Sequence, residues 1–417
     1  MRPPSVDSLA HSLESSGLPH QLRVEAARRS IANNDHENAA KYAREILDDL
    51  LRPVINGTGV IIHTNLGRSP IDPSRTQETS YRYTNLEIDL RNGKRGSRNQ
   101  RVGSMIARYV GAQSAIVVNN GAAAIFLVLA ANASGRSVII SRGELVEIGG
   151  GFRIPEVLSS AGASLVEVGT TNKTRLQDYE KAVQATDAAL ILKVHSSNYK
   201  MTGFVESVSV EALKSLGLPV VFDIGSGLLD ENAPWLGRTR PSWLKDEPGA
   251  RQTLEAGADL VTFSGDKLMG GPQAGIIAGN KSLVETCARH PLYRALRPGN
   301  LVLEAMGATL FAYLDNRAGE LPLWKMAKAS VEELKRRAEL INVGRPTPLS
   351  ATIGGGSLPG QVIDSFGIAI NGDLTQSLRK LDTPIIARME GPDTVIDLRT
   401  VDPSDDPYLH IALQDLA

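Results

Sequence analysis

The chain has 417 residues, of which 42% are hydrophobic and 22% are charged, and its formal net charge is −1 at neutral pH. This ordinary globular composition excludes a global positive field for nucleic acid, so any RNA contact must use a local patch. The single cysteine, Cys287, excludes an internal disulfide framework and a metal site built from several cysteines. We expect Cys287 to be a packed helical residue rather than a nucleophile, and we predict no metal site.

The N-terminal part of the sequence predicts helices. Its opening, MRPPSVDSLAHSLESSG, lacks a basic stretch followed by an apolar core, so it does not have the form of a secretion signal. Residues 1–52 are rich in Ala, Leu, Glu and Arg with helical spacing of apolar residues, which predicts a helical segment ending before Pro53. The longest apolar run, residues 122–133, is shorter than the roughly 18 residues of a membrane span. We therefore expect a cytoplasmic protein that does not enter a membrane.

Residues 53–300 predict a large α/β domain. Continuous apolar runs alternate there with helical stretches, as expected for a mostly parallel sheet that is buried on both faces in a three-layer domain. The runs are residues 114–118, 137–140, 164–168, 188–194, 219–224, 258–263 and 274–279. Residues 301–417 predict a long linking helix over 321–342 and a small α+β C-terminal domain.

Three of the predicted strands deliver polar groups at their carboxyl ends, where open α/β sheets bind ligands. The first is followed by Asn120, Gly121 and Ala122 at the start of a helix, and a helix N-terminus of small residues is an anion site. Asp223 follows another run and needs a cationic partner if it is buried. Ser264, Asp266 and Lys267 follow a third run.

Along the chain, a phosphate-binding turn is followed by an aspartate and then by a lysine. This order is typical of a pyridoxal 5′-phosphate (PLP) enzyme with the aminotransferase-like fold, PLP fold type I. Lys267 would form a Schiff base with the cofactor aldehyde. Asp223 would keep the pyridine nitrogen protonated, and Ser264 with the helix N-terminus would hold the phosphate. The sequence therefore predicts PLP as the cofactor.

Longer motifs make the prediction more specific. They are RPVINGTGVIIHTNLGRSP (52–70), ISRGELVEIGGGFRIP (140–155), VGTTNKT (168–174), KVHSSNYKMTGF (193–204), DIGSG (223–227) and FSGDKLMGGPQAGII (263–277). Together they resemble the bacterial selenocysteine synthases, the L-seryl-tRNA(Sec) selenium transferases. The resemblance runs along the whole chain and is densest over residues 52–300.

This resemblance implies a transferase that converts seryl-tRNA(Sec) to selenocysteinyl-tRNA(Sec) with selenophosphate, through a PLP aldimine and an aminoacrylyl intermediate. It implies that Lys267 and Asp266 are catalytic. It further implies that Arg95, Arg294 and Arg297 bind the phosphate of selenophosphate, a task that suits the guanidinium fork. Arg98 is a weaker candidate for the same role.

Other residues and partners follow from the same resemblance. His195 and Asn198 are candidates to face the cofactor, whereas the place of His63, at a subunit interface or at the site entrance, stays open. Residues 1–52 are the candidate tRNA-binding segment, although their net charge is −1. The family forms homo-oligomers, which implies at least a dimer, with a decamer as the larger assembly. Two alternatives remain open: a PLP-dependent lyase or transferase acting on a small amino acid or amino sugar, and a non-catalytic tRNA-binding homologue.

Overall fold

The computed structural model describes residues 4–72, 82–148, 151–237, 239–355 and 357–416. The chain divides into two compact units. One comprises Met1–Ile55 and Arg379–Ile385, and the other comprises Asn56–Leu378 and Ile386–Ala417. Across the described ranges, no helix combines the length and apolar character needed to cross a lipid bilayer.

The smaller unit contains the helical N-terminal segment that the sequence predicts. Its α-helices are α1 (Val6–Ser12), α2 (His20–Ala32) and α3 (Ala39–Asp48). The Ser5 hydroxyl caps α1 by accepting a hydrogen bond from the Ser8 N–H. Helix α3 buries Tyr42, Ala43 and Ile46 on one face, so the three helices share a small apolar core.

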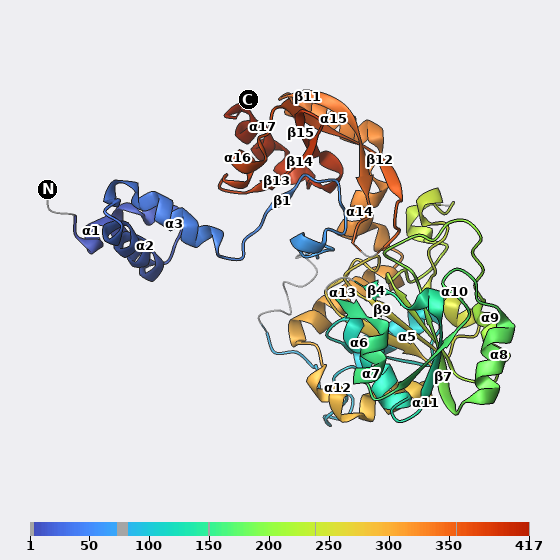
Figure 1. The fold of residues 1–417 in the computed structure, drawn as a ribbon. Coiled ribbons are helices and arrows are strands. Elements are labelled where there is room, and N and C mark those ends of the chain that lie inside the picture. Colours follow the sequence, from blue (N-terminus) through green and yellow to red (C-terminus); the bar gives the residue numbers. More distant parts are fainter. Residues whose placement is uncertain (1–3, 73–81, 149–150, 238, 356, 417) are drawn as a thin grey trace. The chain divides into compact units, whose positions relative to one another are not determined.

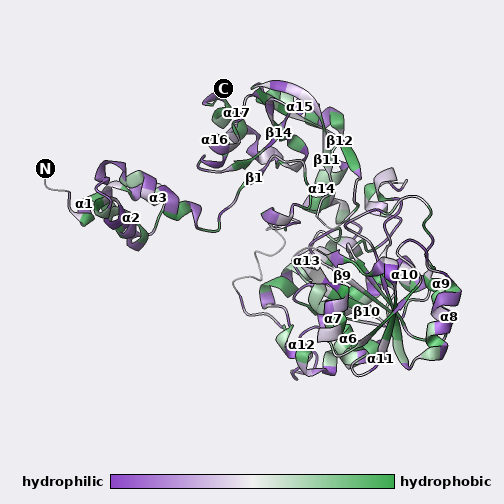
Figure 2. Ribbon diagram, in the orientation of Figure 1, coloured by the Kyte–Doolittle hydropathy of each residue, from purple (hydrophilic) through white to green (hydrophobic). Residues whose placement is uncertain are grey.

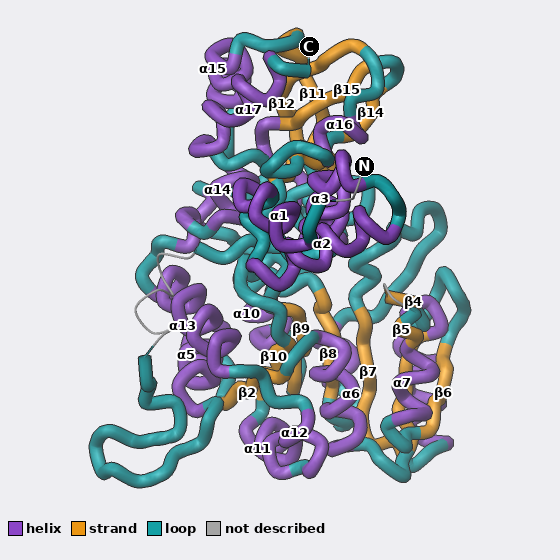
Figure 3. The backbone as a smooth tube through the Cα atoms, turned by 90° about the vertical axis from the view of Figure 1, so that its left-hand side faces the viewer, coloured by secondary structure: helices purple, strands orange, loops and turns teal. Residues whose placement is uncertain are grey.

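A seven-stranded sheet forms the centre of the larger unit. Its order is β2-β10-β9-β8-β7-β3-β6, and the strands are parallel except β10, which runs antiparallel to both of its neighbours. Figure 3 shows β2, β10, β9, β8, β7 and β6 side by side in this order. The bounds are β2 (Ser114–Val118), β3 (Ser137–Ser141), β6 (Ser164–Val168), β7 (Ala188–Val194), β8 (Val220–Gly225), β9 (Leu260–Ser264) and β10 (Gly275–Gly279).

Helices cover both faces of this sheet (Figure 1), which gives the predicted three-layer α/β domain. The first face packs against α5 (Gln100–Val110), α8 (Leu176–Ala185), α9 (Val210–Lys214), α10 (Ala250–Glu255) and α13 (Asn300–Leu314). The second face packs against α6 (Gly121–Asn132), α7 (Ile154–Ser160), α11 (Lys281–Arg289) and α12 (Pro291–Ala295).

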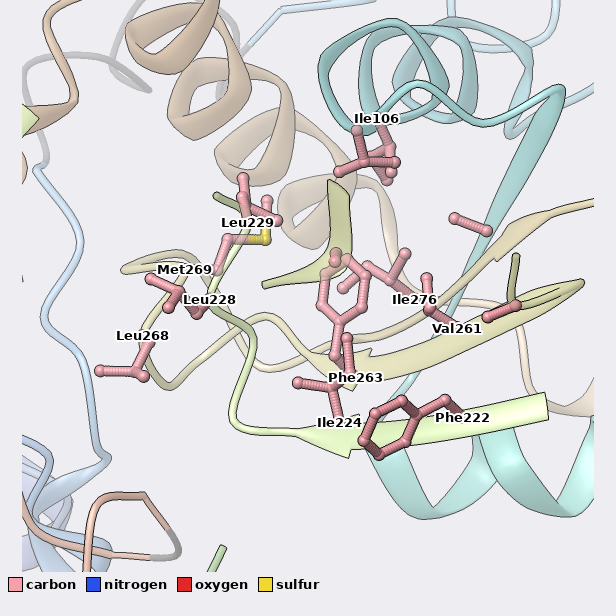
Figure 4. Close-up of a cluster of buried hydrophobic side chains, with 14 of the residues drawn as sticks. Ile106, Phe222, Ile224, Leu228, Leu229, Val261, Phe263, Leu268, Met269 and Ile276 are labelled. Atoms are coloured by element: carbon pink, nitrogen blue, oxygen red, sulfur yellow. The ribbon is translucent and has the colours of Figure 1, made fainter. Parts of the chain in front are cut away.

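The inner strands β7, β8 and β9 are apolar on both sides (Figure 2), because they are buried between two helical layers, whereas the edge strand β6 exposes Ser164 and Glu167. Figure 4 shows one of the two cores, in which Phe222, Ile224 and Phe263 lie with Leu268 and Met269. The last two residues directly follow Lys267, so the segment that carries the predicted catalytic lysine is packed into the core.

The C-terminal part of the larger unit is the predicted small α+β region. Its antiparallel sheet has the order β11-β12-β15-β14. The elements are β11 (Arg345–Thr352), β12 (Val362–Asn371), β14 (Arg388–Glu390), β15 (Asp393–Asp397), α16 (Thr375–Arg379) and α17 (Asp406–Gln414). Two-residue strands also pair as β1 (Ile55–Asn56) with β13 (Ile385–Ile386) and β4 (Glu147–Ile148) with β5 (Phe152–Arg153).

The single helix predicted over residues 321–342 is wrong. Two helices occupy this stretch, α14 (Pro322–Lys328) and α15 (Val331–Ile341). Ala329 has an extended ψ of 129°, and the Ser330 hydroxyl accepts a hydrogen bond from the Glu333 N–H at 3.1 Å. Ser330 is therefore an N-cap that starts a new helix, a local signal that the apolar periodicity of the stretch conceals.

Candidate active site

Lys267 lies in the tight segment between β9 and β10 and is only 4% exposed. The segment is fixed by main-chain hydrogen bonds, from the Leu268 N–H to the Ser226 carbonyl and from the Gly265 N–H to the Ala274 carbonyl, both 2.9 Å long. Burial, followed by the positive charge of Arg68, lowers the pKa of Lys267 below its ordinary value. A buried lysine with a lowered pKa is suited to act as an amine nucleophile or a base.

Asp223 is buried in β8 beside Thr262 of β9, its partner in the parallel register. The Thr262 hydroxyl donates a hydrogen bond of 2.7 Å to Oδ1 of Asp223. Burial raises the pKa of Asp223, although this hydrogen bond and the charge of Lys267 oppose the rise. Such a buried carboxylate favours a cationic partner, as a protonated pyridine nitrogen would be.

The turn that begins α6 forms a third part of the site. The Asn120 side-chain oxygen accepts a hydrogen bond from the Ala123 N–H at 2.8 Å, which caps the helix. The N–H groups of Gly121 and Ala122 lie in the first helical turn, where they have no acceptor within the helix. A Cβ atom added at Gly121 would lie 2.5 Å from the Ser264 hydroxyl, so glycine is needed for this close approach.

The groups of the site thus lie together at the carboxyl ends of β8, β9 and β2. They are Lys267, Asp223, Ser264 and the Asn120–Ala122 turn. They supply an amine, a buried carboxylate, a hydroxyl and a helix N-terminus that favours an anion. Each of the reactive parts of PLP, namely its aldehyde, pyridine nitrogen and phosphate, has a chemically matching group here. The residues present therefore fit the cofactor that the sequence predicts.

Asp266 is held by Arg68, a residue that our sequence reasoning did not single out. The Nη1 atom of Arg68 lies 3.0 and 2.9 Å from the two carboxylate oxygens of Asp266. Arg68 has a positive φ of 65°, a conformation that costs about 1–3 kcal/mol in a residue other than glycine. Hydrogen bonds from the Arg68 N–H to the His63 carbonyl and from the Ser69 N–H to the Asp266 carbonyl hold this conformation.

His63 lies in the same segment as Arg68. Its Nδ1 accepts a hydrogen bond from the Asn65 N–H at 3.2 Å, and partial burial lowers the pKa of its imidazole. The structure therefore brings His63 close to the Asp266 contact through the chain, which favours the site entrance over a role far from the site.

His195 is placed beside the site, whereas Asn198 points elsewhere. The His195 N–H donates to the Asp223 carbonyl at 2.9 Å, and its Nε2 lies 3.3 Å from the buried carboxylate of Glu247. Asn198 is exposed, and its side-chain amide donates to the Glu147 carbonyl at 2.8 Å. A cofactor contact by Asn198 would require this hydrogen bond to break.

The predicted phosphate-binding arginines lie in two places. Arg95 is 77% exposed and is paired with Glu87 at 2.7 Å, and Arg98 also contacts Glu87. Arg294 lies on α12, and Arg297 follows that helix. The Leu296 carbonyl accepts a hydrogen bond from the Asn119 N–H at 2.9 Å, which brings this arginine pair next to the start of α6.

Three groups of the site were missed by the sequence reasoning, namely Thr262, Arg68 and Glu247. Thr262 lies within a predicted strand, and its position two residues before Ser264 places both side chains on one face of β9. The alternation of side chains along the strand could therefore have identified Thr262 as a residue of the site. Arg68 is part of a long motif, but its contact with Asp266 spans 198 positions of sequence, so no local pattern reveals it.

Comparison with known proteins gives a family match over most of the chain. The sequence profile of the family described as L-seryl-tRNA selenium transferase matches residues 54–402. A protein of Geobacter sulfurreducens named L-seryl-tRNA(Sec) selenium transferase is 42% identical over 95% of this chain and 91% of the relative. One of the same name from Carboxydothermus hydrogenoformans is 44% identical over 84% of this chain and 78% of the relative.

Among solved structures, D-glucosaminate-6-phosphate ammonia-lyase is similar to this chain with a TM-score of 0.61. The match covers 88% of this chain and 96% of that structure at 20% sequence identity. At this identity the likeness shows the fold alone, and the chain has the aminotransferase-like fold of PLP fold type I.

Proposed function

This chain belongs to the L-seryl-tRNA selenium transferase family of PLP-dependent transferases, and from that premise we propose that it converts seryl-tRNA(Sec) to selenocysteinyl-tRNA(Sec) with selenophosphate. The observation that carries the proposal is the buried group of Lys267, Asp223 and Ser264 at the α6 N-terminus. These residues suit a cofactor that acts on an amino acid. The name of the family indicates that this amino acid is serine esterified to tRNA.

PLP, when bound, supplies an aldehyde that bonds to amino groups and a ring that draws electrons from the adjacent carbon. Lys267 would hold the aldehyde end, and Asp223 would hold the ring nitrogen as a cation. Ser264 and the Asn120–Ala122 turn would hold the phosphate through a hydroxyl and free N–H groups. His195 would lie against the same group, since its main chain is hydrogen-bonded to Asp223.

Lys267 would also move the proton that the reaction requires. Burial and the charge of Arg68 lower the pKa of its amine, which favours Nζ as the acceptor of the proton of the serine α-carbon. Asp266 is adjacent in the chain, and Arg68 orients its carboxylate. We assign Asp266 the role of guiding proton transfer to and from Nζ of Lys267.

Arginines would bind the phosphate of the selenium donor. Arg294 lies in the last turn of α12 and Arg297 follows that helix, so their guanidinium groups are candidates to bind this anion. Arg95 would have to leave Glu87 before it could bind the same anion. Arg68 is a further cation beside Lys267, although it is engaged with Asp266.

Exposed side chains on two helical parts of the chain support the proposals for its macromolecular partners. The small helical unit is the candidate tRNA-binding part, and Arg28 and Lys41 on it are exposed to contact phosphates. Helix α13 exposes the apolar side chains of Leu301, Phe311 and Leu314, which suits burial against a second copy of the chain. We therefore propose a homo-oligomer of at least two subunits, with a decamer as the larger assembly.

The proposal is tested by supplying the purified chain, loaded with PLP, with seryl-tRNA(Sec) and selenophosphate. We expect selenocysteinyl-tRNA(Sec), detected by mass spectrometry after hydrolysis of the ester. Lys267→Ala should abolish the product and the visible absorbance of bound cofactor, whereas Lys281→Ala, at an exposed lysine of α11, should retain both. Absence of product above the level without enzyme would reject the proposed reaction.

A further inference from the structure

A cavity of about 340 Å³ opens at the carboxyl ends of β3, β7 and β8. Its volume lies in the lower part of the range of about 300–1,000 Å³ that is typical of small-molecule sites. The side chains that matter for its chemistry are those of Lys193, His195, Tyr199, Phe222, Trp243 and Glu247. Of these side chains, His195 is the one to which the reaction proposed above gives a role.

One buried polar atom in the cavity wall has no partner. The side chain of Glu247 is 2% exposed, and its Oε2 lies 3.3 Å from Nε2 of His195. Its Oε1 is also buried and has no hydrogen-bond partner among the described residues. A buried carboxylate oxygen without a donor is costly, so a ligand that presents a hydroxyl or N–H group would be favoured there.

Glu144, a second acidic side chain of the cavity wall, is already satisfied. Glu144 pairs with Lys193 at 2.8 Å through Oε1, and its Oε2 accepts a hydrogen bond from the Val194 N–H. These contacts neutralise the charge of Lys193 and use both carboxylate oxygens. Glu206 and Asp246 also line the cavity, but both are exposed to solvent and are paired with Arg175 and Lys200. Glu247 is the buried acidic side chain of this wall whose second oxygen has no donor among the described residues.

Aromatic rings supply the apolar part of the cavity. Tyr199 and Trp243 are half-buried, and the Tyr199 hydroxyl donates to the Gly143 carbonyl at 2.9 Å, which fixes its ring. Phe222 lies deeper, with the Lys193 ammonium 5.6 Å from its ring centre. A space that combines aromatic walls with an unpaired carboxylate oxygen suits a flat base joined to a sugar, because bases stack on aromatic rings and acidic residues bind ribose hydroxyls.

The cavity adjoins the predicted reaction centre. The negative charge of Glu247 acts on Lys267, and the charge of His195 acts on Asp223. The His195 main chain is also hydrogen-bonded to that of Asp223. His195 and Glu247 therefore belong to the cavity wall and also lie near the predicted reaction centre.

We propose that this cavity binds the 3′-terminal adenosine of the aminoacyl-tRNA, with a ribose hydroxyl on Glu247 and the base against Trp243 and Tyr199. The inference rests on the proposed function and adds the position of the nucleoside. In an aminoacyl-tRNA the serine is esterified directly to the terminal ribose, so a serine held at Lys267 places that ribose next to it. The cavity beyond His195 and Glu247 is where such a ribose and its base would lie.

The test measures adenosine binding to the full-length, PLP-loaded protein by isothermal titration calorimetry. Filling the cofactor site first prevents adenosine from occupying it, and the readout does not depend on turnover. We expect saturable binding to the wild-type protein and an increase in Kd of at least tenfold in Glu247→Gln and in Trp243→Leu. Glu211→Gln, an exposed carboxylate change on α9, is the matched control and should leave Kd unchanged.

A second measurement compares two serine esters through the change that each causes in the visible absorbance of the bound cofactor. We expect 3′-O-seryl-adenosine to bind at least tenfold more tightly than serine methyl ester, and Glu247→Gln to remove this advantage. Equal affinity of the two esters, or adenosine binding unaffected by both cavity substitutions, would overturn the cavity assignment. Lack of an absorbance response to either ester, with no selenocysteinyl-tRNA formed, would instead reject the proposed function, and adenosine binding would still report on the cavity.

Discussion

Nη1 of Arg68 lies within 3.0 Å of both carboxylate oxygens of Asp266, the residue directly before the buried lysine. This contact joins the segment after β1 to the segment after β9, far apart in sequence. The contact places the positive charge of Arg68 near Lys267, and it pairs the negative charge of Asp266 with that arginine. Both effects act on the lysine. Arg68 therefore affects the lysine through its own charge and through the orientation of Asp266.

Arg68→Gln should raise the pKa of Lys267, because the Arg68 charge is one cause of its lowering. The amine must be unprotonated to bond to the cofactor, so cofactor attachment to the apoprotein should slow near neutral pH and recover at higher pH. The rate should fall about tenfold for each unit by which the pKa rises. Stopped-flow absorbance from pH 6 to 10 measures this profile; Arg68→Lys, which keeps the charge, should shift it less. An unchanged midpoint in Arg68→Gln would contradict this role.

Gly121→Ala should weaken PLP binding by about tenfold or more, equivalent to roughly 1.4 kcal/mol. The added Cβ would lie 2.5 Å from the Ser264 hydroxyl, so that hydroxyl must leave its position. Alanine is favourable in a helix, so the melting temperature of the apoprotein should change little. Absorbance titration with PLP gives the affinity.

Ser264→Ala provides the matched test of that steric explanation. In the double variant the clash is absent, since the Gly121 substituent would meet only the Cβ of residue 264, at 3.7 Å. The two losses should therefore be less than additive. Additive losses would show that the Ser264 hydroxyl is not what makes alanine unfavourable at position 121.

Tyr313→Phe should lower the free energy of unfolding by about 1–3 kcal/mol, because two buried partners lose their hydrogen bonds. The Tyr313 hydroxyl accepts from Nε1 of Trp324 at 2.8 Å and donates to the Met269 carbonyl at 2.9 Å. The second contact holds the segment that follows Lys267, so PLP affinity should also fall. Chemical denaturation and PLP titration measure the two effects.

Tyr179→Phe is the control for this effect, since Tyr179 is equally buried but lies on α8. We expect a comparable loss of stability without a loss of PLP affinity. If both variants lowered PLP affinity to the same extent, the effect would be a general loss of packing rather than a loss of positioning of the Lys267 segment.

Cys287 should resist alkylation in the native protein. It is buried in α11, and burial raises the pKa of its thiol to about 11. At pH 8 the reactive thiolate is therefore about a thousandth of the total, and its share grows as the pH approaches 11. Mass spectrometry after iodoacetamide treatment should show modification in urea but almost none without it. Equal rates in both conditions would contradict the packed helical role.

Much of the fold could be predicted because its sheet strands are short apolar runs, each bounded by helical stretches. The predicted runs and the strands β2, β6 and β7 have the same bounds, because each strand is a short and mostly apolar run. The break between α14 and α15 was missed because apolar spacing continues across it. There the Ser330 cap decides the structure.

The candidate site was predictable to the extent that strand ends determine it. Ser264 directly follows the run 258–263, Lys267 comes three residues later, and Asp223 lies near the end of the run 219–224, so their proximity follows from the sheet. Arg68 and Glu247 come from loops whose paths depend on tertiary packing, and their partners cannot be read locally. Asn198 shows that a residue near a strand end can turn its side chain to another loop. Its cofactor contact stays a prediction.

The antiparallel strand β10 has a consequence for how the protein is made. It lies between β9 and β2, so β2 gains this neighbour only after about 160 further residues have been synthesised. At about 5–20 residues per second this delay is roughly 10–30 s. Until then the helix N-terminus at Gly121 and the strand end at Ser264 are not held together by the sheet, and the predicted phosphate site is incomplete. We therefore expect cofactor capture to be a late event in biosynthesis, after β10 has emerged from the ribosome.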